Sequence, residues 1–359
     1  MSHELIRPGD GRGSAQLSEQ MTATSRHLSS DSTFPLVSVC IPTFNAARWI
    51  LACLESALAQ SYRRLELLII DDASTDETVE LIRSIDDERI RLVVNEQNIG
   101  LARNWNKCIE MSRGDFIKFL FHDDILYPDC VEKMMRLLLS NGNVGLVFSP
   151  RDVIVEGDPE AELTKIWLQN CTTLHTRFRA IEAVNHGREL FVQYLNRGFR
   201  GNWIGEPSSV LIRKECFARV GLFNPNLHQV CDVEMWLRIM FSYDIGFLPE
   251  KVSAFRFHSD STSFRNITSR RNCFDQLWLL ESLSNCNTIG SAHPEIEGIR
   301  ALELLRFGKT FLLHPFVIGQ YLRTDRVARQ GFQHLPKWTK SAAVYSARKL
   351  FRRGVRAKG

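Results

Sequence analysis

The chain contains the stretch FIKFLFHDD at residues 116–124, in which a run of apolar residues ends in two adjacent carboxylates. Residues 116–121 have the length and apolar content of a buried strand. Ionised carboxylates are costly to bring together without a positive partner, and hard divalent ions such as Mg2+ bind carboxylate oxygens together with substrate phosphates. Asp123 and Asp124 therefore favour a cation site. The alternative interpretation is a helix N-cap followed by an acid in the first turn.

Strands and helices alternate on both sides of this stretch. Apolar runs typical of strands occupy residues 36–41, 65–70, 90–94 and 144–148. Apolar residues with helical spacing occupy residues 47–60, 76–85, 100–111 and 129–139. Strict alternation predicts an α/β fold, with a parallel sheet covered by helices on both faces. In such a sheet ligands bind at the carboxyl ends of the strands.

Polar residues follow three further predicted strands. The first strand ends in PTFN at residues 42–45, the second in DDASTD at residues 71–76, and the third in NEQNIG at residues 95–100. Ser74 and Glu77 form a capping-box pattern for the next helix. Asp71 precedes that pattern, so its carboxylate could accept a hydrogen bond from a ligand donor such as a base imide. No glycine-rich P-loop or dinucleotide fingerprint follows any strand.

The composition is that of an ordinary globular protein, with 44% hydrophobic and 24% charged residues in a chain of 359. Nine scattered cysteines without a Cys-x-x-Cys pair favour reduced thiols in a cytosol. Residues 1–34 lack an apolar signal core and read as a disordered extension. Ten basic residues and no acid follow Asp325, so the rest of the chain is net acidic although the whole carries +4. We expect any anionic partner to meet that tail.

Four motifs in the same order resemble glycosyltransferase family 2, whose members have the GT-A fold. The motifs are VCIPTFN at residues 39–45, IDDASTD at 70–76, NIG at 98–100 and HDDILYP at 122–128. The resemblance covers residues 36–262. It implies a GT-A catalytic domain at residues 35–265, between the extension at 1–34 and a helical C-terminal region at 266–359.

The resemblance also implies roles for single residues. Thr43 and Asp71 match positions that hold the nucleotide base, Asp123 matches a ribose contact, and Asp124 matches the carboxylate that binds Mg2+ or Mn2+ at the diphosphate. Other candidates for nucleotide binding are Pro42, Asn45 and Asn98 in the matched motifs, and Arg103 shortly after the third motif. The family's motif is often Asp-x-Asp-Asp, and Phe121 replaces its first Asp. A variant with only the final pair also occurs in the family.

A later segment, HQVCDVEMWLR at residues 228–238, resembles the family helix that begins with the catalytic acid pair, usually Glu-Asp. Cys231 replaces the Glu, and Asp232 matches the general base that removes a proton from the acceptor hydroxyl. The alternative for Asp232 is an N-cap. Glu234 and Arg238 are four residues apart and favour an ion pair, while Trp236 fits either the core or a wall of the acceptor site.

The last motif, FRFHSDSTS at residues 255–263, resembles the family's Tyr-Arg-x-His-x-x-Ser-x-Ser. His258 matches a position that can bind the metal or contact the diphosphate, and the alternative is a structural histidine. Glu206, in GEPS at residues 205–208, falls where family members line the acceptor pocket.

These observations predict an inverting, metal-dependent glycosyltransferase that uses Mg2+ or Mn2+. The resemblance favours a UDP- or dTDP-sugar donor and a glycan or lipid-linked acceptor, in polysaccharide or glycan assembly on the cytoplasmic side of a membrane. Residues 341–355 read as a basic amphipathic helix that could lie on anionic lipid or dock on the acidic body. Nucleic acid is a poorer partner, because no aromatic platform accompanies the charges. The alternatives are a nucleotidyltransferase and a non-catalytic protein that binds nucleotide sugars or acts as a membrane scaffold.

Overall fold

The computed structural model describes residues 34–158, 161–268, 274–286, 289, 293–313, 322–323, 326–327 and 329–340. The predicted extension before residue 34 and the predicted basic helix at 341–355 lie outside these residues. From Leu36 on, the described residues form one compact unit.

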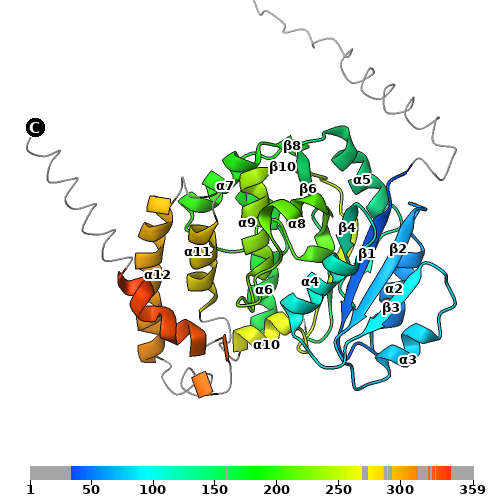
Figure 1. Cartoon of the computed structure of the whole chain (residues 1–359), viewed down its shortest axis with the longest axis horizontal. Helices are drawn as coiled ribbons and strands as arrows, with labels where there is room; N and C mark the ends of the chain where they lie inside the picture. The colour runs from blue at the N-terminus through cyan, green and yellow to red at the C-terminus, as the bar shows by residue number, and fades with distance from the viewer. Residues whose placement is uncertain are drawn as a thin grey trace, which may run out of the picture. The chain divides into compact units, whose positions relative to one another are not determined.

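A mixed sheet of eight strands forms the centre of this unit (Figure 1), in the order β3-β2-β1-β4-β9-β6-β10-β8. Its strands are β1 (Val37–Thr43), β2 (Leu65–Asp71), β3 (Ile90–Val94), β4 (Phe116–Phe119), β6 (Val144–Phe148), β8 (Val184–Asn185), β9 (Val210–Arg213) and β10 (Asp244–Phe247). β1, β2 and β4 are buried along their whole length, as expected of strands with helices on both faces.

The prediction of an entirely parallel sheet is wrong at β9. This strand pairs antiparallel with both β4 and β6, and β8 pairs antiparallel with β10. β9 has four residues and follows a 3-10 turn, η3 (Pro207–Ser209), so the alternation of strands and helices that ends near residue 148 does not include it. A second, three-stranded sheet contains β5 (Ile125–Leu126), β11 (Ser253–Phe257) and β7 (Asp152–Val155).

The four predicted helices are present, but each begins one to three residues after its predicted first residue. They are α2 (Ile50–Leu58), α3 (Thr78–Arg83), α4 (Leu101–Met111) and α5 (Cys130–Ser140). The capping box proposed for Ser74 and Glu77 is wrong. The Ser74 hydroxyl donates to Asp71, and it is Asp76 that accepts from the backbone N–H of Thr78 at the start of α3.

Besides η3, five described helices lie between residues 162 and 242. They are α6 (Glu162–Cys171), η2 (Leu174–Arg177), α7 (Gly187–Asn196), α8 (Glu215–Val220) and α9 (Cys231–Ser242). Every residue of α9 from Cys231 to Phe241 is buried, because the helix lies inside the unit with neighbours on all sides. Such a helix can present a polar side chain to a site only at one of its ends.

The described part of the C-terminal region is mostly helical, as predicted. It contains α10 (Thr262–Thr268), α11 (Asp275–Asn285), α12 (His293–Leu313) and a further helical stretch at 329–340. Figure 1 shows α11 between α9 and α12. Trp338 in the last stretch is fully buried, and its indole N–H donates to Glu281 Oε2 of α11 at 2.9 Å. The helical stretch at 329–340 is therefore packed against α11.

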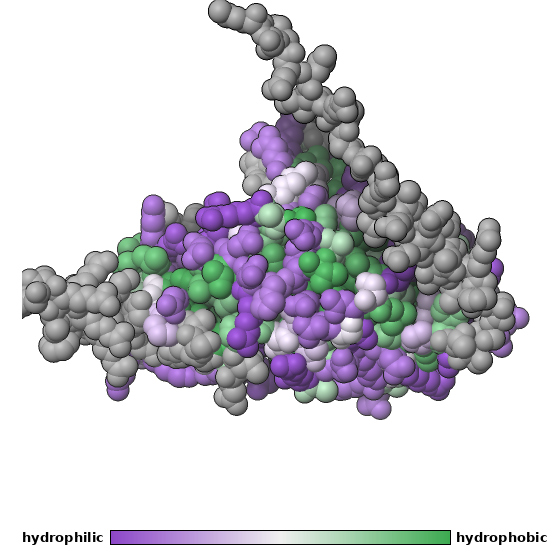
Figure 2. Space-filling view, turned by 90° about the horizontal axis from the view of Figure 1, so that it is seen from above, coloured by the Kyte–Doolittle hydropathy of each residue, from purple (hydrophilic) through white to green (hydrophobic). Residues whose placement is uncertain are grey.

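The surface and the cysteines fit an ordinary globular chain. Hydrophobic residues on the face in Figure 2 form separate patches among hydrophilic ones. None of the described helices combines the length and apolar content needed to cross a lipid bilayer. Six buried cysteines are thiols, in agreement with the sequence prediction: Cys40, Cys53, Cys108, Cys130, Cys216 and Cys231.

Candidate active site

The carboxyl ends of β1 and β2 place Thr43 and Asp71 side by side, because they are paired in the parallel register. Thr43 Oγ1 donates to Asp71 Oδ1 at 3.2 Å, and the Ser74 hydroxyl donates to the same oxygen at 2.5 Å. The Ser74 N–H donates to Oδ2 at 2.8 Å. Asp71 is fully buried, so these bonds fix the position of its carboxylate at the carboxyl end of β2. Oδ2 keeps one lone pair for a further donor.

Two candidates next to this pair differ in exposure. Asn45 is exposed and has φ 49°, a left-handed conformation that Asn tolerates better than most residues. Its backbone N–H donates to the Ser74 hydroxyl at 2.8 Å, and its side-chain oxygen accepts from the Thr75 N–H at 2.9 Å. Pro42 is buried, and its carbonyl lies 3.3 Å from His122 Nδ1. The loops after β1 and β2 are thus tied together.

Asp72 holds the third loop, a role that the sequence did not reveal. Its Oδ1 accepts from Asn95 Nδ2 and from the Ile99 N–H, both at 2.8 Å, and its Oδ2 accepts from the Gly100 N–H at 2.9 Å. Gly100 has φ +87°, a conformation that favours glycine. The loop presents Asn98 to solvent, and Arg103 is exposed on the first turn of α4. The adjacent acids Asp71 and Asp72 therefore fix two different loops.

Asp123 contacts His258 directly, although the two are 135 positions apart in sequence. The distance between Asp123 Oδ2 and His258 Nε2 is 3.0 Å, and the His258 ring packs on Trp49 with centroids 4.2 Å apart. Burial opposes ionisation of Asp123, but the hydrogen bond from His258 and the nearby His122 hold its pKa below the usual value. The structure thus brings the HDD motif and the final FRFHSDSTS motif into contact.

Asp124 is fully buried beside Asp123. Its Oδ1 accepts from the Arg256 N–H at 2.9 Å, whereas its Oδ2 is buried without a hydrogen-bond partner. Burial raises the pKa of Asp124 well above the usual value, and the charges of Asp123 and Glu206 raise it further. The Arg256 side chain also donates to the Asp123 carbonyl at 2.8 Å, so this arginine holds both acids in place.

Glu206 connects the acid pair with Asp232. Its carboxylate is paired with the buried Arg151, at 2.5 Å from Nε and 3.0 Å from Nη2. The charge of Glu206 raises the pKa of Asp124 and of Asp232, so both carboxyl groups lie within its field. Sequence reasoning missed Arg151, which follows β6 and has no motif of its own.

Asp232 lies at the start of α9 and is 9% exposed. Its Oδ2 accepts from Asn202 Nδ2 at 2.8 Å, and its Oδ1 lies 2.7 Å from the Val233 N–H. Burial raises its pKa to about 7, with Glu206 adding to the shift and the two donors opposing it. A carboxyl with this pKa is half ionised near neutral pH, which suits a general base.

Trp236 lies one turn further along α9 and is 1% exposed. Its indole N–H donates to the Gly205 carbonyl at 3.0 Å, so it supports the loop that carries Glu206. The buried Lys118 of β4 supports the other end of that loop, through the carbonyls of Ser208 and Val210. Trp236 is therefore a core residue that supports the Glu206 loop, and its ring does not form an exposed wall of the site.

The acid pair Asp123 and Asp124 fits a divalent cation that takes most of its ligands from the substrate phosphates and not from the protein. Among the described residues, no three His, Cys, Asp or Glu side chains converge as a complete metal site would require. However, Asp124 Oδ2 and His258 Nδ1 are both buried without a hydrogen-bond partner. A proton on His258 Nε2, facing Asp123, leaves a lone pair on Nδ1. Mg2+ typically binds one or two carboxylates plus substrate phosphates, and these atoms match that pattern.

Comparisons with known proteins show the family of this chain. The sequence profile described as Glycosyl transferase family 2 matches residues 38–203. An uncharacterized protein of Mycobacterium tuberculosis is 35% identical over 262 residues, which cover 72% of this chain and 80% of that protein. A protein of Rickettsia prowazekii named as an uncharacterized glycosyltransferase is 27% identical over 270 residues, covering 74% and 79%.

The chain belongs to glycosyltransferase family 2. It spans 38% of another member, an uncharacterized glycosyltransferase of Rickettsia felis that is 28% identical over 246 residues. Membership makes the chain a transferase and excludes the nucleotidyltransferase alternative.

Solved structures show the same fold at low identity. Staphylococcus aureus TarS 1–349, in complex with UDP-GlcNAc, aligns with a TM-score of 0.52 and 12% identity over 87% of this chain and 92% of that chain. The mannosyltransferase PcManGT from Pyrobaculum calidifontis, in complex with GDP-Man and Mn2+, aligns with a TM-score of 0.53 and 16% identity over 94% of both chains. The glycosyltransferase fold is therefore established for this family member.

Proposed function

We propose that this chain moves a sugar from a nucleoside-diphosphate donor to a hydroxyl acceptor with inversion at the anomeric carbon. The observation that carries the proposal is the position of Glu206, whose charge acts on both Asp124 and Asp232. These two acids come from distant parts of the sequence, and the same carboxylate acts electrostatically on both of them. Inversion needs a base at the incoming hydroxyl and positive charge at the leaving diphosphate, which a cation held by Asp124 would supply.

Asp232 is the proposed base. Its carboxylate accepts the acceptor proton, while Asn202 and the Val233 N–H orient it. Burial, with the charge of the Arg151-bound Glu206 adding to it, raises the pKa of Asp232 to about 7, where a base is effective near neutral pH. Attack of the hydroxyl then displaces the diphosphate directly, and no covalent sugar intermediate is required.

Asp124, Asp123 and His258 are the proposed contacts of the donor end. Asp124 Oδ2 and His258 Nδ1 are the unpartnered atoms that would hold Mg2+ or Mn2+. A bound divalent cation supplies positive charge that stabilises the leaving diphosphate. Arg256 fixes the two acids through its backbone N–H and its side chain. PcManGT, whose structure contains Mn2+, supports this assignment as a neighbour of the same fold.

Thr43, Asp71 and the exposed Asn45, Asn98 and Arg103 are the proposed nucleotide contacts. Asp71 Oδ2 has one lone pair left for a base N–H, and the family resemblance favours uracil or thymine as that base. The neighbours do not choose between bases, since TarS is complexed with UDP-GlcNAc and PcManGT with GDP-Man. We therefore propose a UDP- or dTDP-sugar donor, used in glycan or polysaccharide assembly.

The test is release of nucleoside diphosphate from a panel of UDP-, dTDP- and GDP-sugars, with Mn2+ or with EDTA. We expect turnover only with the metal and only with some donors. Asp232→Asn should lower turnover by about 10²-fold or more while UDP affinity stays near wild type, since it removes a base and no donor contact. Asp124→Asn should abolish the Mn2+ dependence of UDP affinity.

The exposed Asp86 on the α3–β3 connection provides a matched control, because Asp86→Asn makes the same chemical change away from the site. It should behave as wild type in every assay. Absence of turnover with all donors, together with intact nucleotide binding, would support the non-catalytic alternative. Full turnover by Asp232→Asn would show that the base lies elsewhere.

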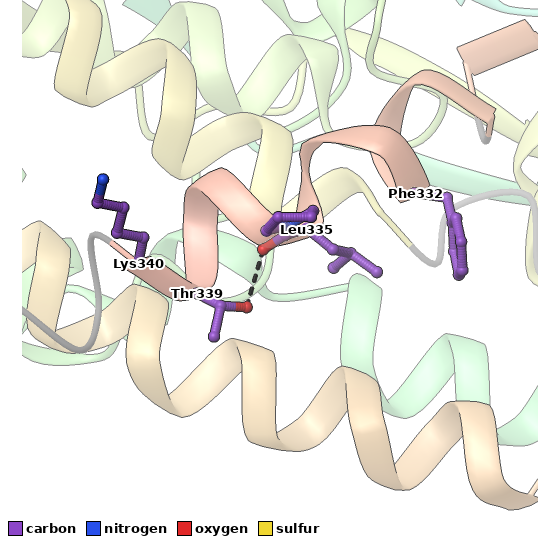
Figure 3. Close-up of a pocket in the computed structure, with 5 residues that line it drawn as sticks. Phe332, Leu335, Thr339 and Lys340 are labelled. Carbon is purple, nitrogen blue, oxygen red and sulfur yellow. Dashed lines mark hydrogen bonds between the residues drawn. The ribbon is translucent and has the colours of Figure 1, made fainter.

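We also propose that the C-terminal region attaches the enzyme peripherally to an anionic membrane at the cytoplasmic face. Three leucines at helical spacing on α12 are unusually exposed: Leu302 at 57%, Leu305 at 74% and Leu312 at 80%. Phe332, Leu335 and Pro336, with Thr339 and Lys340, line a shallow hollow of about 560 Å³. Figure 3 shows Phe332 and Lys340 at the two ends of this row. Exposed apolar groups followed by a basic tail are suited to lipid headgroups, and a lipid-linked acceptor would then be within reach.

A further inference from the structure

The segment His228–Val230, which leads into α9, is held by a single carboxylate of the C-terminal region. Asp275 is the first residue of α11 and is 3% exposed. Its Oδ2 accepts from the backbone N–H groups of His228 at 3.1 Å, of Gln229 and of Val230 at 3.2 Å. Three successive N–H groups therefore converge on one buried oxygen.

The same segment is also held from α10. Asn266 Nδ2 donates to the His228 carbonyl at 2.9 Å, and Gln229 Nε2 donates to Ser263 Oγ at 3.0 Å. Both the backbone and a side chain of the segment thus have partners in the C-terminal region. Asp232 follows only two residues after Val230, so any movement of the segment moves the start of α9.

A second contact holds α11 along α9. The Ser282 hydroxyl donates to Glu234 Oε1, and Glu234 forms a fully buried pair with Arg238 at 2.7 Å. Asp275 and Ser282 are two turns apart on α11, and they contact the beginning and the first turns of α9 respectively. Figure 1 shows the two helices as neighbours. α11 therefore holds α9, the helix that carries Asp232, at two points: just before its first residue and within its first turns.

We propose that Asp275 is a positioning residue for the reaction, which places Asp232 by binding the three N–H groups ahead of α9. The proposal rests on the proposed role of Asp232 as base. Asp275 does not touch the reacting groups. Its contribution is geometric, because an error of about 1 Å in the position of a catalytic group can lower the rate by about 10²-fold. The C-terminal region is then part of the catalytic machinery and not an appendage.

The test compares Asp275→Asn with Glu281→Gln in the full chain. Both acids lie on α11 and are buried, but Glu281 pairs with Lys337, Trp338 and Arg300 and does not contact the segment before α9. Asp275→Asn presents an amide to the three N–H groups and should lower kcat by about tenfold or more, with UDP affinity within about twofold of wild type. Glu281→Gln should lower the melting temperature and leave kcat near wild type.

The pH profile gives a readout that a purely structural role would not change. The pKa of Asp232 is raised mainly by burial, with Glu206 from the neighbouring loop adding to it and Asn202 opposing it. Among the described residues, Tyr194 and Cys231 also interact with the charge of Asp232. If Asp275→Asn loosens the start of α9, water reaches Asp232 and the acid limb of kcat moves to lower pH. The acid limb of Glu281→Gln should stay in place.

Three results would overturn the proposal: an unchanged kcat in Asp275→Asn, an unchanged acid limb, or an equal loss of kcat in Glu281→Gln. If Asp275→Asn does not fold, Asn266→Ala carries the test, because it removes the bond to the His228 carbonyl from a different helix. It should lower kcat in the same direction by a smaller factor, and an unchanged kcat would again refute the proposal. An incorrect assignment of the base is distinguishable from these results, because it would appear as full turnover by Asp232→Asn.

Discussion

The proposed base is Asp232, and its environment predicts a pH dependence. A base must be ionised to accept a proton, and burial raises the pKa of Asp232 to about 7. We expect kcat to rise about tenfold per pH unit below pH 7 and to level off above it. A profile measured with saturating donor would check this. An acid limb near pH 4, the ordinary range of a carboxyl group, would contradict the assignment.

The same pKa predicts a change in stability. Because the folded-state pKa of Asp232 is raised, the protonated form is favoured by folding, and its contribution to stability is lost as pH rises from about 4 to about 7. Asp232→Asn cannot ionise, so the difference in free energy of unfolding between the variant and wild type should grow in favour of the variant across that range. Urea unfolding at pH 5 and pH 8 would measure it, and an equal difference at both pH values would disagree with the shift.

Candidate site residues could be selected from the sequence where they follow a strand. Asp71, Asp123 and Asp124 were selected in that way, since the carboxyl edge of a parallel sheet is where ligands bind, whereas Asp232 was selected from the family resemblance. Their partners were not predictable. Arg151 and Asn202 lie in loops, and a loop carries no period that would place its side chains against a residue far away in sequence.

At the scale of elements, the loop from Asn202 to Glu206 depends on one glycine. Gly205 has φ +121°, and a Cβ there would collide with Ser209 Oγ. Asn202 Oδ1 accepts from the Gly205 N–H at 2.9 Å, which connects this turn to the Asp232 contact. The conformation of the turn thus sets the positions of both Asn202 and Glu206.

We therefore expect Gly205→Ala to destabilise the fold by about 1–3 kcal/mol and to lower turnover more than donor affinity. Thermal unfolding and donor turnover would measure the two effects. Gly142→Ala is the matched control, because an added Cβ at Gly142 would meet no atom within 4 Å and its φ is not positive. Equal behaviour of the two variants would show that the turn tolerates a side chain.

The strands and helices of the first half of the chain are close to those predicted from the sequence pattern, whereas β9 was not predicted. Long apolar strands and periodic helices between residues 36 and 148 determine their own type. β9 has four residues, and its direction is set by its neighbours β4 and β6 rather than by its own pattern. The reversal matters because β9 follows η3 directly, so the loop carrying Glu206 arrives at the edge where Asp124 lies. Tertiary pairing decided this part of the site.

At the scale of the whole molecule, the described C-terminal helices belong to the catalytic unit. Trp338 is fully buried and Glu281 joins it to α11, so a truncation that tests the tail must leave residues up to 340 intact. Beyond Lys340 the sequence carries six basic residues and no acid: Arg348, Lys349, Arg352, Arg353, Arg356 and Lys358. This segment can be removed without touching any described contact.

Deleting residues 341–359 should release the protein from anionic liposomes at low salt and leave UDP affinity and thermal stability unchanged. Each basic residue near an anionic surface contributes about 1 kcal/mol, an attraction that falls off within a Debye length of about 10 Å at 0.1 M salt. Co-sedimentation with phosphatidylserine vesicles would measure the binding, with neutral phosphatidylcholine vesicles as the control. If the exposed leucines of α12 also insert, Leu305→Ser and Leu312→Ser in the full chain should weaken the binding that remains at high salt. Undiminished binding by the truncated chain would refute attachment through the tail. A melting temperature lowered by the deletion would instead indicate that the tail docks on the acidic body, where its charges have partners within the same molecule.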